Sequence, residues 1–174
     1  MTLEAKMDGE PVFAEATHDR AGMRPLAAIK FEAAVGQMAL VLMRTRQHRF
    51  SFLRDLEWLV MPAIATGQFV VADRRDETTG ISVPAAAVLW AKVSAEVDAR
   101  LCDTLERGIR LRPEEWASGP IPWLVEGCGE SRAVGKLVRS VVERHFPVIG
   151  IKAIARAPDG TLGVRVLKKD EAAA

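Results

Sequence analysis

The period of the hydrophobic pattern changes repeatedly along this 174-residue chain, and this alternation constrains the fold more than any other feature. Segments with apolar residues every three or four positions predict helices, and short Val-, Ile- and Ala-rich segments between turn residues predict strands. The expected order is helix, helix, strand, strand, helix, strand, helix, strand, strand. It predicts an α+β protein, an α/β sandwich in which helices flank a mixed sheet.

Two helices are expected in the first third of the chain. The first begins at Leu26 and contains Gly36. Glycine there costs up to about 1 kcal/mol relative to alanine, so we expect close packing at that position. The second covers 53–67 and contains Pro62, which predicts a kink or an early end. The expected apolar faces comprise Phe31, Val35, Met38 and Leu42 in the first helix, and Leu53, Leu56, Val60 and Ile64 in the second.

The middle of the chain predicts a hairpin and a helix. Residues 68–73 and 81–93 are strand-like and flank a polar turn, so we expect an antiparallel pair, although 85–87 also fits a helix. Ser94 is a suitable N-cap for a helix that ends before Gly108. The expected inner face of that helix comprises Val97, Leu101 and Leu105.

The last third predicts a strand, a helix and a second hairpin. A strand is expected at 123–127, followed by a flexible Gly-rich loop, GCGES. A helix at 132–146 follows, and strands at 149–157 and 161–167 flank a PDG turn. The inner face of the helix is expected to comprise Val134, Leu137, Val138 and Val141.

Composition narrows the classes of function. With 49% hydrophobic and 27% charged residues, the composition is typical of a globular domain. We expect this domain at 26–167, a flexible extension at 1–25 and a frayed tail at 168–174. A formal net charge of +1 gives no general reason to bind nucleic acid. The sequence has neither a secretory signal pattern nor an apolar run of about 18 residues, so we expect no membrane span and a cytoplasmic location. The absence of tyrosine excludes a tyrosine general acid.

Histidine and cysteine are scarce, which limits the candidate chemistry. Cys102 and Cys128 form no CxxC pair and have no metal-ligand spacing, so we expect neither a metal site nor a disulfide framework. His48 lies in the polar link RTRQHRF, 44–50, between the first two helices, where an acid–base residue can be held on both sides. The alternative is a solvated loop histidine. A Cys128 nucleophile paired with His48 is less favoured than an uninvolved loop thiol.

A second candidate region surrounds the strand at 123–127. Trp123 and Glu126 are expected at a sheet edge or cleft, and the following loop and helix N-terminus favour an anionic group. The helix carries a basic stripe that comprises Arg132, Lys136 and Arg139. Its first residues, 132–135, form an RAVG segment that ends at Gly135. RAVG resembles part of the pyrophosphate loop of GCN5-related acetyltransferases, whereas a solvated helix face is the alternative for the basic stripe.

Six segments within 35–167 carry a wider resemblance. In order they are VGQMALVLMRTRQHR, LVMPAIATGQFVV, VLWAKVSAEVDARL, RPEEWASGPIPWLVEG, LVRSVVERHFP and IKAIARAPDGTLGVRV. Together they resemble the toxin-activating lysine acyltransferases, a family that acylates internal lysines of RTX haemolysins. The combinations PAI, EEWASG and HFP make the resemblance specific.

The resemblance implies a fold similar to GCN5-related acetyltransferases, an acyl carrier protein thioester as donor and no bound cofactor. It implies that a fatty acyl group is transferred to an internal lysine of an RTX-type target protein. His48 falls on the family's catalytic histidine. Glu126, three positions after Trp123, stands where the family has a catalytic aspartate, and Leu59 stands where it has an asparagine.

The implied reaction is aminolysis of a thioester by lysine. Because a free lysine has a pKa of about 10.4, only about one molecule in 2,500 is neutral at pH 7. His48 would therefore take the proton, and Glu126 would orient the imidazole or hold the incoming ammonium. The basic stripe would receive the acidic acyl carrier protein. An acyltransferase for a small amine or peptide, and a non-catalytic binding module, stay open as alternatives, as does a homodimer.

Overall fold

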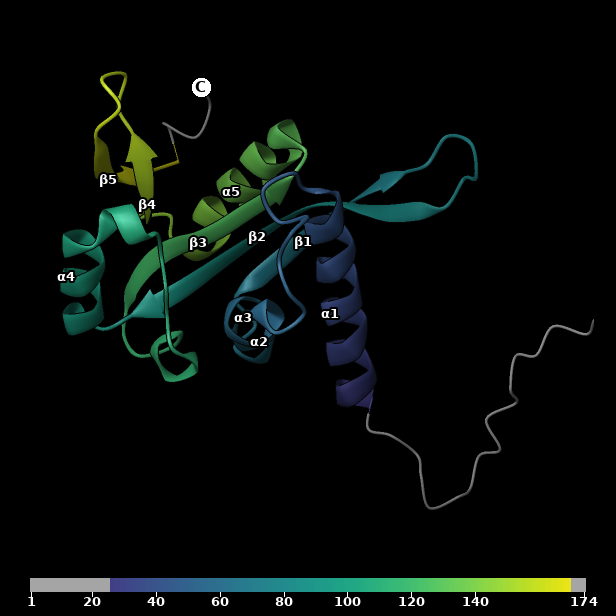
Figure 1. Ribbon diagram of the computed structural model, residues 1–174, viewed down its shortest axis with the longest axis horizontal. Coiled ribbons are helices and arrows are strands. Elements are labelled where there is room, and N and C mark those ends of the chain that lie inside the picture. Colours follow the sequence, from purple (N-terminus) through teal and green to yellow (C-terminus); the bar gives the residue numbers. More distant parts are fainter. Residues whose placement is uncertain (1–25, 170–174) are drawn as a thin grey trace, which may run out of the picture.

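The computed structural model describes residues 26–169, which form a five-stranded mixed sheet with helices on both faces (Figure 1), so the predicted α+β fold is confirmed. The helices are α1 (Leu26–Arg44), α2 (Asp55–Leu59), α3 (Met61–Ala65), α4 (Ala95–Asp103) and α5 (Ser131–His145), with 3-10 turns η1 (Leu105–Arg107) and η2 (Pro113–Glu115). The strands are β1 (Phe69–Arg75), β2 (Ser82–Val93), β3 (Ile121–Gly129), β4 (Ile151–Arg156) and β5 (Leu162–Leu167). The extension predicted at 1–25, and residues 170–174 of the predicted tail, lie outside the described residues.

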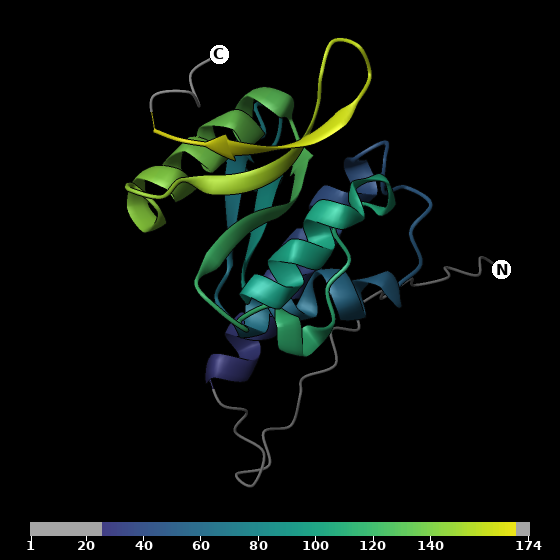
Figure 2. The same cartoon turned by 90° about the vertical axis from the view of Figure 1, so that its left-hand side faces the viewer.

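The strands follow one another across the sheet in chain order, β1-β2-β3-β4-β5. Both predicted hairpins are confirmed, since β1 pairs with β2 and β4 with β5 in antiparallel register. Residues 85–87 lie within β2, which excludes the helical alternative. Strands β3 and β4 are parallel and are connected through α5. Figure 2 shows α5 and α4 on opposite sides of the strands.

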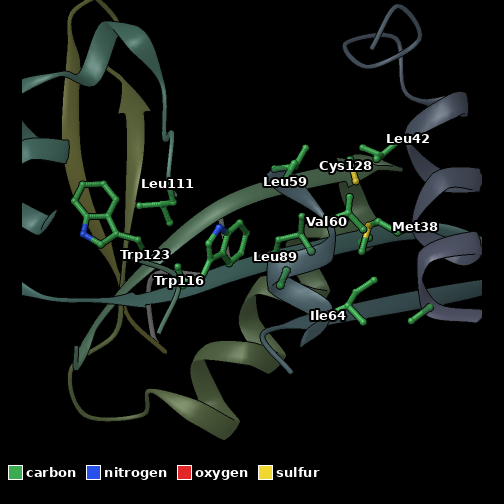
Figure 3. Close-up of a cluster of buried hydrophobic side chains, with 14 of the residues drawn as sticks. Met38, Leu42, Leu59, Val60, Ile64, Leu89, Leu111, Trp116, Trp123 and Cys128 are labelled. Carbon is green, nitrogen blue, oxygen red and sulfur yellow. The ribbon is translucent and has the colours of Figure 1, made fainter. Parts of the chain in front are cut away.

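Two apolar clusters join these layers. One contains residues of α1, α3 and α4 with one face of β2 and β3, and the other contains residues of α5 with the opposite face. In Figure 3, Met38 and Leu42 of α1 point toward Val60 and Cys128, and Trp123 lies at the far end of the same cluster. Within the predicted face of α1, Met38 and Leu42 are fully buried, whereas Phe31 and Val35 are only partly buried. 

Two local predictions in this region are wrong. Gly36 was expected at a close contact, but a Cβ there would meet no atom within 4 Å among the described residues. Leu53 was expected in the apolar stripe of the second helix, but it is 86% exposed. The helix begins only at Asp55, so Leu53 lies in the preceding turn, in which the Asp55 carboxylate accepts the Phe52 N–H at 2.8 Å.

The predicted effect of Pro62 is confirmed, because the expected second helix is divided at Val60 into α2 and α3, and Pro62 lies in the first turn of α3. The N-cap of α4 is confirmed as well, since Ser94 Oγ accepts the Val97 N–H. Leu105, expected on the inner face of α4, lies instead in η1.

The predicted Gly-rich loop after residue 127 is wrong, because β3 continues to Gly129. Gly129 has φ +103°, and a Cβ at that position would collide with the carbonyl oxygen of Ala85. Ala85 is the extra residue of a bulge in β2, which also accommodates Pro84. The glycine therefore serves close strand packing, and only Glu130 separates β3 from α5.

Strands β3 and β4 meet at a single register pair, Trp123 with Lys152, among the described residues. Asp98 of α4 accepts the Trp123 indole N–H at 2.7 Å and the Lys152 ammonium at 2.7 and 2.8 Å. Beyond this pair the described strands share no further register partner, and residues 124–127 of β3 and 153–154 of β4 line one open cavity, so a wedge lies between the strands. Asp98 and Lys152 are only 17% and 28% exposed, so their ion pair is partly shielded from solvent.

We predict that Asp98→Asn destabilises the protein by about 2 kcal/mol, because it leaves the partly buried Lys152 ammonium without its charged partner. Urea unfolding followed by circular dichroism measures the change. Asp103→Asn on the same helix is the control, since Asp103 is exposed and its substitution is expected to change stability by less than about 0.5 kcal/mol. Equal stability of the two variants would contradict the anchoring role of Asp98.

Candidate active site

The link between α1 and α2 holds His48 in a series of tight turns. The Thr45 carbonyl accepts the His48 N–H at 3.0 Å, and the His48 carbonyl accepts the Ser51 N–H at 2.9 Å. The His48 side chain is only 11% exposed. This burial excludes the alternative of a solvated loop histidine.

A bulge in β3 directs Glu126 toward His48. Opposite residues of the β2–β3 pair share a face, and the pairs Leu89–Glu126 and Trp90–Leu124 leave Val125 as an extra residue. Without this bulge, strict alternation would place Glu126 on the face opposite Trp123, against α5. With it, Glu126 shares the face of Leu89, which packs in the α1 cluster.

The two side chains meet at the end of this arrangement. His48 Nε2 lies 3.3 Å from Glu126 Oε2, while Glu126 Oε1 accepts the Gly127 N–H at 3.1 Å. Nε2 is buried and forms no well-aligned hydrogen bond within residues 26–169, so the contact is primarily electrostatic. It becomes an ion pair when the imidazole is protonated.

The electrostatics of the site favour the protonated imidazole. The contact with the Glu126 carboxylate raises the pKa of His48, burial lowers it, and the negative charges of Glu126 and Asp55 raise it further, with a net increase. The pKa of Asp55 itself is lowered, first by the Trp58 indole and then by the Phe52 N–H. Asp55 thus stays ionised near His48.

His48 and Glu126 open into a cavity of about 640 Å³, here called the cleft. Its walls come from the α1–α2 link, from α2, from the segment around η1 and from the wedge between β3 and β4. Charged residues on its walls include Asp55, Glu106, Arg107 and Arg110. Leu59, which the family resemblance identified as a departure, is buried and also lines the cleft.

The predicted donor-binding residues lie apart from the cleft lining. Trp123 is completely buried and donates its indole N–H to Asp98. The other four lie on the exposed side of α5 and are Arg132, Gly135, Lys136 and Arg139. Gly127 connects the two regions, because it lines the cleft and a Cβ there would lie 2.9 Å from Val134 of α5.

Cys128 is not available as a nucleophile. It is 2% exposed and packs in the α1 cluster. Burial, followed by the charge of Glu126, raises the pKa of its thiol to about 12. A thiol with that pKa stays protonated at neutral pH, so the pairing of Cys128 with His48 is excluded.

Sequence reasoning missed part of the cleft wall. Asp55, Trp58 and Arg110 all line it, with the Arg110 guanidinium 4.4 Å from the Trp58 ring centre. Asp55 could have been found from the sequence, because acidic residues are enriched in the first turn of a helix. The contact between Arg110 and Trp58 had no local signal, because 52 positions separate the two residues in the chain.

A buried imidazole beside a carboxylate, at the inner wall of an open cleft, is the arrangement of a general acid–base site. The sequence model of the RTX toxin acyltransferase family matches residues 27–169. The chain belongs to this family. The protein is therefore an RTX toxin acyltransferase. A search of curated proteins finds no match.

Two further structural findings concern residues 26–169 alone. No helix in this range is long and apolar enough to cross a membrane. No group of three or more His, Cys, Asp or Glu side chains in it is arranged to hold a metal ion.

We predict that the imidazole of His48 titrates above the ordinary histidine pKa of about 6.5, and that Glu126→Gln lowers this pKa because it removes the carboxylate charge. NMR of the imidazole, assigned with His48→Ala, measures both values. Since the folded-state pKa is raised, the pair stabilises the fold below about pH 6.5 and loses this contribution as pH rises through the raised pKa. An unchanged pKa in Glu126→Gln would contradict the pairing.

Proposed function

We propose that the protein transfers a fatty acyl group from an acyl carrier protein thioester to the ε-amine of an internal lysine in an RTX-type toxin. The single observation that carries the chemistry is the contact between His48 and Glu126 at the cleft, 3.3 Å between Nε2 and Oε2. The family match supports the reaction class and the toxin as substrate.

His48 acts as the general base. The lysine ammonium first gives up one proton to solvent. The neutral amine then attacks the thioester carbonyl carbon, a C–N bond forms, and the second proton of the nitrogen passes to the neutral imidazole. Because Nε2 faces Glu126, the proton is accepted at Nδ1. The tetrahedral intermediate then expels the carrier thiolate, and the C–S bond breaks. The imidazolium returns the proton to the thiolate, which leaves the amide and the free carrier thiol.

Glu126 is the positioning residue of this scheme. Its carboxylate stabilises the imidazolium that forms during attack, since the two charges are close and shielded from solvent. Its second oxygen is fixed by the Gly127 N–H, so the carboxylate is held in place before substrate binds. On the cleft walls the charges of Asp55 and Glu106 are balanced by those of Arg107 and Arg110, so the Glu126 carboxylate leaves one net negative charge beside a neutral His48, which favours a lysine ammonium.

The donor enters through the wedge between β3 and β4. There the strands share no register partners beyond Trp123 and Lys152, so their facing edges suit the amide groups of a carrier's pantetheine arm. The acidic carrier docks on the exposed stripe of α5, which begins directly after β3. The stripe comprises Arg132, Lys136 and Arg139.

Intact-mass spectrometry tests the reaction. An RTX protein or its lysine-bearing fragment is incubated with the enzyme and acyl carrier protein thioesters, and a gain of one acyl mass that resists hydroxylamine indicates a lysine amide. His48→Ala is expected to lower the rate about 10²–10⁴-fold, as loss of a general base does. Cys128→Ala is the control and is expected to retain acyl transfer, because its thiol is buried and protonated.

The outcomes separate the alternatives. Acyl transfer at an unchanged rate in His48→Ala would contradict the base assignment. Transfer to free amines or short peptides but not to an RTX fragment would assign the protein a different acceptor. No transfer with any donor or acceptor would favour a binding module that retains the fold.

We predict that Lys136→Glu raises the KM for the acyl carrier protein donor about tenfold, because it reverses one charge in the docking stripe. The increase should diminish at high ionic strength, since salt screens exposed charges. Lys30→Glu, an exposed charge reversal near the start of α1, is the control. An unchanged donor KM in Lys136→Glu would remove the docking stripe from the mechanism.

A further inference from the structure

A second cavity adjoins the cleft at His48. It has a volume of about 210 Å³ and lies between the last turns of α1 and the link that leads to α2. His48 and Ser51 line both cavities. We call this second cavity the apolar groove, because most of its remaining wall is apolar and comprises Ala39, Leu42, Met43, Phe52, Leu53 and Leu56.

Several apolar side chains of the groove are largely exposed to solvent, which is unfavourable for apolar surface. Met43 is 71% exposed, Phe52 is 75% exposed and Leu53 is 86% exposed. Single exposed apolar residues are common in proteins, but a contiguous group that lines a cavity indicates a binding surface. Their placement is fixed by the turn in which Asp55 accepts the Phe52 N–H.

We propose that the apolar groove binds the acyl chain of the thioester donor. This inference rests on the proposed function, because it takes His48 as the group beside the reacting carbonyl. A thioester carbonyl carbon carries two substituents, the carrier arm and the acyl chain, and the incoming amine adds a third. If the arm and the amine occupy the cleft, the chain needs a separate path that also begins at His48.

The contrast between the two cavities assigns the chain to the groove. The cleft carries ionised groups, among them Asp55, Glu126 and Arg110, and an alkyl chain there would remove charged groups from water. Besides His48, the groove has one charged residue, which is Arg49. The Arg49 guanidinium lies 4.6 Å from the Phe50 ring centre. Each methylene buried in the groove is expected to tighten binding about fourfold.

The groove also makes the protein selective for chain length. Affinity should rise with each added methylene until the groove is filled, and further carbons should add little. Substitutions of Met43 and Leu53 are informative because these two side chains are exposed, so a polar replacement is expected to change folding stability by less than about 0.5 kcal/mol.

Binding of carrier proteins that bear non-hydrolysable amide analogues tests the inference. The quantity measured is the ratio of Kd for a four-carbon chain to Kd for a sixteen-carbon chain, by fluorescence anisotropy of labelled acyl carrier protein. The ratio is expected to exceed ten in the wild-type protein and to fall at least fivefold in Met43→Ser and Leu53→Ser. Ile81→Ser and Val148→Ser, which are 62% and 85% exposed and line neither cavity, are the matched controls.

The outcomes separate this inference from the proposed function. A wild-type ratio near one, or an equal ratio in groove variants and controls, would overturn the inference even where acyl transfer is observed. If groove variants change only self-association in sedimentation velocity and leave the ratio intact, the groove binds a second copy, and the acyl assignment is wrong. A reduced ratio in the groove variants, with the controls unchanged, would support the assignment even if the toxin acceptor were replaced by another amine.

Discussion

The site depends on the carboxylate of Asp98, which holds β3 and β4 together at one point. Parallel strands in a regular sheet continue their hydrogen bonds along their whole length. Here Trp123 and Lys152 both bond to Asp98, and the strands separate beyond them. Because α4 supplies Asp98 from one face, the anchor does not block the wedge. The wedge therefore supplies one wall of the cleft, and the α1–α2 link and the segment around η1 supply the others.

The opposite wall of the cleft depends on a second constraint, the register of β2 and β3. Glu126 reaches His48 because Val125 is an extra residue in β3, which turns the carboxylate to the α1 face. A strand without this bulge would direct Glu126 toward α5, where a carboxylate would be buried among valines. The contact between His48 and Glu126 thus requires both the turns around His48 and the irregularity in β3.

The sequence predicted the elements that local patterns specify. Val97 and Leu101 are buried on α4 and Val138 on α5, as their helical spacing indicated, and the division near Pro62 followed from the chemistry of proline. It did not predict features that depend on tertiary contacts. The cluster GCG was interpreted as a loop, although Gly129 is glycine because the β2 backbone passes too close for a Cβ. The bulge at Val125 has no local signature, so the sequence placed Glu126 near His48 through family resemblance rather than through strand periodicity.

The resemblance leads us to expect an aspartate where this chain has Glu126, and the glutamate is compatible with this geometry for a physical reason. A longer side chain has one more rotatable bond, and this freedom normally weakens a positioned contact. Here the Gly127 N–H holds Oε1 at 3.1 Å, so only Oε2 faces His48. The bond to the adjacent backbone N–H thus restrains the longer side chain. An aspartate on the same bulged strand would have a shorter reach, so the backbone restraint and the longer side chain compensate for each other in positioning the carboxylate.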